Sequence, residues 1–126
     1  MTTQEKYAAR LNSVGLNASQ KDRGGVVRFQ RITAVEARRL LDSGCADPEG
    51  NTNGSPTFLE ITEFLEENPS FVAHGYIVVQ RRPDERITLE GVAETQKPSQ
   101  EEIDNFTKMF QTADEFTLNP CKAWYD

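Results

Sequence analysis

The chain has 126 residues and a net charge of −6, from 14 basic and 20 acidic side chains. This length predicts a single globular domain over residues 1–126, and the negative charge argues against a general affinity for nucleic acids or acidic membranes. The longest apolar run, at 76–79, is far shorter than the ~20 residues of a membrane-spanning helix, so no membrane segment is expected.

The charge is divided unevenly along the chain. Residues 1–40 hold eight bases and three acids, a net charge of +5, whereas the rest of the chain holds six bases and seventeen acids, a net charge of −11. Such a division is typical either of a contact surface for a partner or of a basic segment that folds against an acidic remainder.

The few residues suited to metal binding or catalysis are scattered. Cys45 and Cys121 are far apart, and the N-terminus lacks the pattern of a signal peptide, so we expect free thiols and a cytoplasmic protein. His74 is the single histidine, and no nucleophile lies in a recognisable motif. The sequence therefore predicts no catalytic residue, no metal site and no cofactor.

The first forty residues predict a helix and then a strand. Apolar residues at helical spacing favour a helix over 2–14, and a polar loop with two glycines follows it. Alternation over 26–32 predicts a strand that carries Arg28 and Gln30 on its polar face.

Two further helices are indicated by their terminal residues. Thr33 and Glu36 form a capping-box pattern, which predicts a helix start at that point. Residues 45–54 hold no large apolar side chain and are expected to form a mobile loop. The Ser-Pro pair at 55–56 marks the start of the next helix, which the Asn-Pro pair at 68–69 ends.

A β-hairpin over 71–80 and 86–95 is the clearest feature of the sequence. The odd-numbered residues of both strands are the apolar ones, so odd must pair with odd across a loop of three or five residues. This register places Gly75 opposite Gly91. Paired glycines favour either close packing of a helix or a small hollow for a ligand.

The even-numbered face of the hairpin is the predicted contact surface. The register sets Tyr76 opposite Glu90 and His74 opposite Val92, and it brings His74 near enough to Glu90 for a raised histidine pKa. If the strand over 26–32 joins the sheet, the polar face gathers one set of side chains: Arg28, Gln30, His74, Tyr76, Thr88 and Glu90. An ordinary solvated sheet face is the alternative.

The last helix follows a second capping box, Ser99 and Glu102, and the tail over 116–126 forms either a short edge strand or an extended cover. The order of elements predicts an α+β fold, with a small, mainly antiparallel sheet of about three strands that includes the hairpin. Three or four helices are expected to cover one face of this sheet.

Three functional hypotheses follow from these patterns. The first is a small cytoplasmic binding or regulatory module that acts through protein–protein contact or self-association. The second is a small-ligand binder or minor enzyme that uses a hollow at Gly75 and Gly91 or the surface around His74. The third, which the overall charge disfavours, is weak nucleic-acid contact through the N-terminal arginines and those at 81, 82 and 86.

Overall fold

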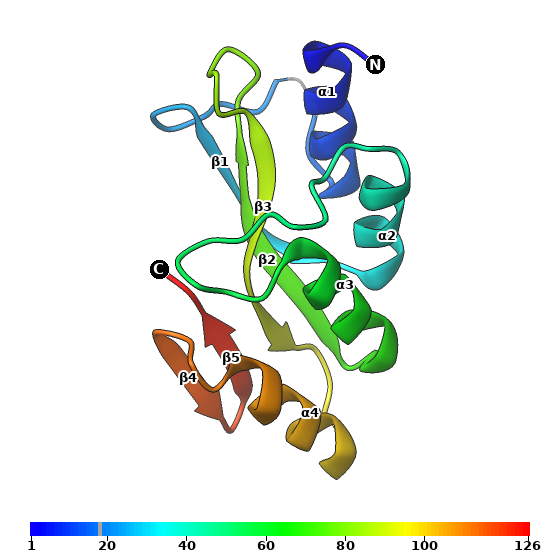
Figure 1. Cartoon of the computed structure of the whole chain (residues 1–126), viewed down its shortest axis with the longest axis vertical. Coiled ribbons are helices and arrows are strands. Elements are labelled where there is room, and N and C mark those ends of the chain that lie inside the picture. The colour runs from blue at the N-terminus through cyan, green and yellow to red at the C-terminus, as the bar shows by residue number, and fades with distance from the viewer. Residues whose placement is uncertain (18) are drawn as a thin grey trace.

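The structure, a computed structural model, describes residues 1–17 and 19–126. In this described part, four helices and five strands follow one another along the chain, and Figure 1 shows how they are arranged. In order they are α1 (Thr3–Ser13), β1 (Val26–Ile32), α2 (Ala34–Asp42), α3 (Phe58–Glu67), β2 (Phe71–Val78), β3 (Arg86–Glu94), α4 (Gln100–Phe110), β4 (Glu115–Leu118) and β5 (Cys121–Trp124).

The helices begin at residues that cap them. The predicted capping boxes at the starts of α2 and α4 are confirmed, with Ser99 accepting from the Glu102 amide at 3.1 Å. Helix α3 begins two residues later than the Ser-Pro pair indicates, because Thr57 accepts from the Glu60 amide and Glu60 accepts in return from the amide of Thr57. In α3 and α4 the capping box thereby satisfies two backbone amides, those of the cap residue and of the glutamate.

The sheet is antiparallel throughout and has five strands, in the order β1-β2-β3-β5-β4. The prediction of an α+β fold is confirmed, but the expected number of about three strands is too small. The two further strands form a hairpin from the C-terminal tail, with Leu118 paired to Cys121 across a two-residue turn at 119–120.

The predicted register of the first hairpin is wrong. Strands β2 and β3 are joined by residues 79–85, a longer loop than expected, so Gly75 pairs with Leu89 and Tyr76 with Thr88. Glu90 is an extra residue in β3, and beyond this bulge His74 lies opposite Gly91. The expected pairs of Gly75 with Gly91, Tyr76 with Glu90 and His74 with Val92 therefore do not form.

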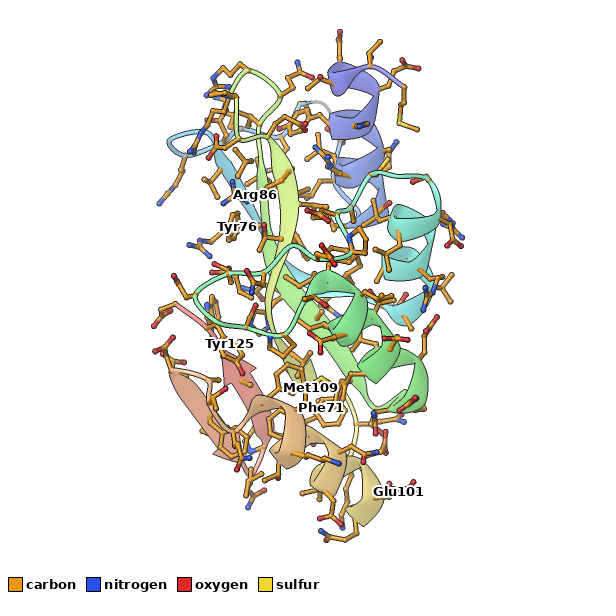
Figure 2. All side chains as sticks on the ribbon, viewed as in Figure 1. Phe71, Tyr76, Arg86, Glu101, Met109 and Tyr125 are labelled. Carbon is orange, nitrogen blue, oxygen red and sulfur yellow. The ribbon has the colours of Figure 1, made fainter. Side chains whose placement is uncertain are left out.

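The helices lie along one side of the sheet, which we call the inner face (Figure 1). Ile77, Leu89 and Val92 point to this face and are almost completely buried with the apolar residues of the helices. Leu89 and Val92 share the face only because the bulge at Glu90 exchanges odd and even positions between them. Phe71 of β2 lies beside α4, where its ring stacks on Phe106 at 5.3 Å between centroids (Figure 2).

The connection between α2 and α3 crosses in front of β3 before it returns to the helical side (Figure 1). Its backbone is tied to its own neighbours and to α3, since the Phe58 amide donates to Gly50 O at 2.8 Å and the Thr52 amide to Ser55 Oγ at 3.0 Å. The mobility of residues 45–54 stays a prediction. None of the helices in the described part of the chain has the length and apolar character required to cross a membrane.

Candidate functional site

The candidate site lies on the opposite, outer face of the sheet, where Arg28, Tyr76 and Glu90 meet. Arg28 Nη1 of β1 and Glu90 Oε1 of β3 form an ion pair at 2.6 Å that crosses over β2. The Arg28 guanidinium lies 5.8 Å from the centroid of the Tyr76 ring. The Glu90 side chain is only 6% exposed whereas that of Arg28 is 62% exposed, so the arginine covers a buried carboxylate and remains open to solvent.

Arg86 completes this cluster, and the sequence reasoning missed it as a site residue. Its guanidinium carbon lies 5.5 Å from the Tyr76 ring centroid, Nη2 donates to the tyrosine hydroxyl at 3.0 Å, and Nε donates to Thr88 Oγ1 at 3.1 Å. Tyr76 and Arg86 are therefore neighbours on adjacent strands (Figure 2). Arg86 has the same parity as Thr88 and Glu90, so the strand alternation already contained this signal.

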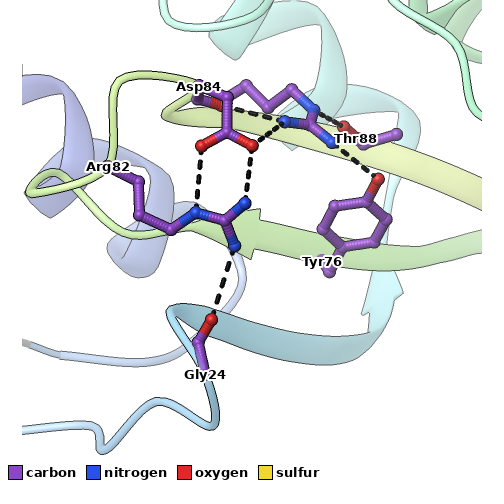
Figure 3. A network of polar contacts seen from close by, with 6 residues as sticks. Gly24, Tyr76, Arg82, Asp84 and Thr88 are labelled. Atoms are coloured by element: carbon purple, nitrogen blue, oxygen red, sulfur yellow. Dashed lines mark hydrogen bonds and ion pairs between the residues drawn. The ribbon is translucent and has the colours of Figure 1, made fainter.

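Asp84 holds Arg86 and Arg82 in place at the end of the hairpin, as Figure 3 shows. Arg82 donates from Nε and Nη2 to the two Asp84 carboxylate oxygens, at 2.9 and 2.7 Å. Arg86 Nη1 donates to the Asp84 carbonyl at 2.9 Å and to its carboxylate at 3.2 Å. Because one carboxylate fixes two guanidinium groups, the cluster is arranged before any partner arrives.

These contacts also change the acidity of the tyrosine. Partial burial alone raises the pKa of Tyr76, but the polar contacts with Thr52 and Arg86 outweigh it and leave the pKa below its usual value. We name Arg28, Tyr76, Arg82, Asp84, Arg86, Thr88 and Glu90 the arginine–tyrosine surface.

A shallow hollow of about 320 Å³ lies on this surface beside Tyr76. Three arginines line it, together with Val26, Val78 and Glu90, and the α2–α3 connection supplies Thr52 and Asn53 as part of its wall. The connection therefore reaches the outer face although it begins and ends on the helical side.

His74 and Gln30, the other predicted members, lie outside this cluster. Gln30 is exposed in a bulge of β1, and His74 is 5% exposed and packs against Trp124 of β5 with 4.5 Å between ring centroids. Burial, assisted by the charge of Lys122, lowers the pKa of His74 to about 4. The expected raised pKa is therefore wrong, because Glu90 pairs with Arg28 and desolvation acts on a histidine whose Nε2 has no partner among the described residues.

The two hairpin glycines are explained by the close approach of strand backbones. A Cβ atom on Gly75 would lie 1.9 Å from the Thr88 carbonyl oxygen, and one on Gly91 would lie 1.9 Å from the Ala123 carbonyl oxygen. Since the glycines are not paired and peptide oxygens fill the space beside each, the geometry gives no support to a ligand hollow between them.

Several of the arginines that would contact nucleic acid are held in ion pairs at separate places on the molecule. Arg81 pairs with Asp22 at 2.7 Å, and Arg38 of α2 pairs with Glu66 of α3 at 2.7 Å. Arg10, which is buried, contacts Glu85. The basic segment thus folds partly against acidic residues, which reduces the positive field available to a polyanion.

The described residues contain no group of three or more histidine, cysteine, aspartate or glutamate side chains arranged to hold a metal ion. Cys45 and Cys121 are both buried free thiols, and burial raises the pKa of Cys121. Neither a protein-family model, nor a curated protein, nor a solved structure matches the chain.

Proposed function

We propose that this protein is a small cytoplasmic binding module that acts through protein–protein contact, with the arginine–tyrosine surface as its contact. The observation that supports this most is the ring of Tyr76, which lies between two guanidinium groups on the sheet face opposite the helices. Tyrosine and arginine are enriched among the residues that dominate binding energy at interfaces.

The rigidity of the surface adds to this support. Arg86 donates through Nε, Nη1 and Nη2 to fixed acceptors, so little side-chain freedom is lost when a partner covers it. Among the described residues, Arg28 donates only from Nη1, to Glu90, which leaves its other donors for a partner. The two buried free thiols fit a cytoplasmic setting.

The test is cross-linking of the tagged protein in an extract of its own cells, followed by mass spectrometry, for the wild type and the Tyr76→Ala variant. We expect the variant to lose the cross-linked species, including any dimer of the chain, because its ring is the centre of the surface. Lys108→Ala, an exposed change on α4, is the control and should keep them.

Circular dichroism of the folded variants separates lost contact from lost structure. If a folded Tyr76→Ala protein retains all cross-links of the wild type, or if Lys108→Ala removes them instead, the arginine–tyrosine surface is not the contact.

A second candidate function is the binding of a small anionic ligand in the hollow beside Tyr76. It is favoured by the three arginines that line the hollow, Arg28, Arg82 and Arg86. A thermal-shift screen of carboxylate and phosphate metabolites tests it. A stabilising compound whose effect is lost in Arg28→Ala supports ligand binding, and the absence of any stabilising compound removes it.

A further inference from the structure

Strand β1 is an open edge of the sheet, because its single neighbour in the strand order is β2. The residues just before β1 form a hairpin turn with β1 that extends over a single bridge. Arg23 and Val26 form one antiparallel bridge around Gly24 and Gly25, which both have left-handed φ angles, +62° and +85°. Asp22 then turns away to pair with Arg81, so the hairpin does not continue along β1.

The hydrogen-bond alternation shows which backbone groups of β1 face this edge. The Val79 amide donates to Gly25 O at 2.9 Å, which makes residues 25 and 79 a hydrogen-bonded pair. Bonded and non-bonded pairs alternate along antiparallel strands. Val27 with Ile77 is therefore the next bonded pair, and Arg28 with Tyr76 is a non-bonded pair. The amide and carbonyl of Arg28 consequently point away from β2, toward the open edge.

A groove of about 520 Å³ runs beside these groups. It is lined by Gln20, Lys21, Arg23, Val26, Val27 and Arg28. Consecutive residues of a strand point to opposite faces, so a groove that touches Val26, Val27 and Arg28 follows the edge of the strand. Among the lining residues every charged side chain is basic, although the whole chain has a net charge of −6.

We propose that an extended, acidic segment of a partner protein adds to β1 in this groove as a sixth strand. The partner backbone would bond to the outward amide and carbonyl of Arg28, the half-buried side chain of Val26 would contact a small apolar side chain, and acidic side chains would pair with Lys21 and Arg23. This inference rests on the proposed function, since Arg28 belongs to both the edge groove and the arginine–tyrosine surface, and it adds the conformation and charge of the partner.

The charge of β1 also disfavours a second copy of this strand as the occupant of the groove. Antiparallel pairing of two β1 edges would bring Arg28 and Arg31 of one copy against the same arginines of the other, and like charges opposite one another destabilise a sheet. The basic edge thus excludes its own copy and favours an acidic strand.

The experiment measures binding of a synthetic peptide that alternates glutamate with threonine and valine to the full chain. Fluorescence polarisation gives affinity, and ¹⁵N amide shifts give location. We expect the largest shifts at Arg28 and its β1 neighbours, and binding that weakens about tenfold in a Lys21→Glu/Arg23→Glu variant. Arg39→Glu/Lys108→Glu, at exposed positions of α2 and α4, changes the net charge by the same amount; it is the matched control and should bind as the wild type does.

Two further peptides separate strand addition from simple charge attraction. A peptide with every backbone amide methylated keeps the charge but has no N–H to donate from either edge, so it cannot pair as a strand. A lysine version keeps the strand but reverses the charge. Neither peptide should bind. Equal binding of either peptide, shifts away from β1, or no binding of the acidic peptide overturns the inference. If the acidic peptide fails while Tyr76-dependent cross-links persist, strand addition is wrong and the proposed function stands.

Discussion

The two faces of the sheet exclude water by different means. On the inner face, Ile77 and Leu89 are buried by apolar side chains from the helices. On the outer face, His74, Thr88 and Glu90 are each about 5% exposed, yet no helix of the described chain packs over them. They are covered by the long side chains of Arg28, Arg86 and Trp124. The inner face therefore supplies stability, and the outer face presents a polar surface whose geometry is already fixed.

The largest effect is expected from removing an inner-face ring. Phe106 is fully buried and stacks on Phe71 and Phe116, with 5.3 and 5.1 Å between ring centroids. Phe106→Ala should lower the free energy of unfolding by about 4 kcal/mol in urea titrations, because it leaves a cavity. Leu118→Ala, at a side chain 48% exposed, should change it by less than about 0.5 kcal/mol. Equal losses in the two variants would contradict the burial of Phe106 in the core.

The second largest loss of stability is expected from a substitution at Gly91, next to the bulge in β3. Gly91→Ala puts a methyl group 1.9 Å from the Ala123 carbonyl oxygen, so β3 and β5 must separate, at a cost of about 3 kcal/mol. Gly50→Ala, whose methyl group would lie 3.3 Å from Asp47 O, should cost about 1 kcal/mol or less. Thermal unfolding of the two variants checks this order, and a Gly91→Ala protein as stable as the wild type contradicts the strand spacing.

The burial of His74 on the outer face should make the free energy of unfolding depend on pH. The pKa of His74 is about 4 in the folded chain and 6.5 when the imidazole is fully solvated, as in the unfolded chain, so between these values the unfolded chain binds more protons. The buried, neutral His74 therefore contributes fully to the free energy of unfolding above pH 6.5. As the pH drops, this contribution falls by up to about 3 kcal/mol. The difference in unfolding free energy between wild type and His74→Gln, measured across this range, isolates it from the carboxylates. Parallel curves for the two proteins would show that His74 titrates normally.

The smallest effect concerns the tyrosine hydroxyl. Tyr76→Phe removes the hydrogen bond from Arg86 Nη2 but keeps the ring, and should cost about 1 kcal/mol of unfolding free energy. Tyr7→Phe is the control, because the described residues offer no hydrogen bond to that hydroxyl, and it should be neutral. A neutral Tyr76→Phe would mean that Arg86 does not hold the ring.

Much of the fold is predictable because its signals are local. Apolar spacing and caps such as Ser99 with Glu102 indicate the helices, and alternation indicates the first three strands. The C-terminal hairpin is predictable only in part, since its strands have four residues each and gain order by pairing with β3. The bulge at Glu90 escapes prediction because it depends on how far β5 and β2 approach the β3 backbone, which no local pattern encodes.

The candidate site, like the fold, is predictable only where its signals are local. Arg28, Tyr76 and Glu90 share a surface because alternation places them on one face even when the register is wrong. Arg86 is missed because it is counted with Arg81 and Arg82 as a basic cluster at the turn, although it is the first residue of the predicted strand over 86–95. The burial of His74 depends on Trp124, which belongs to the C-terminal hairpin that the sequence indicates only as a possible edge strand or cover.

Amide hydrogen exchange of the cross-linked complex, compared with the free protein, tests most directly which face the protein uses. We expect new protection in β1 and on β2 around Tyr76, with the amides of α3 and α4 unchanged. Protection that appears on those two helices and leaves β1 as it was would contradict it.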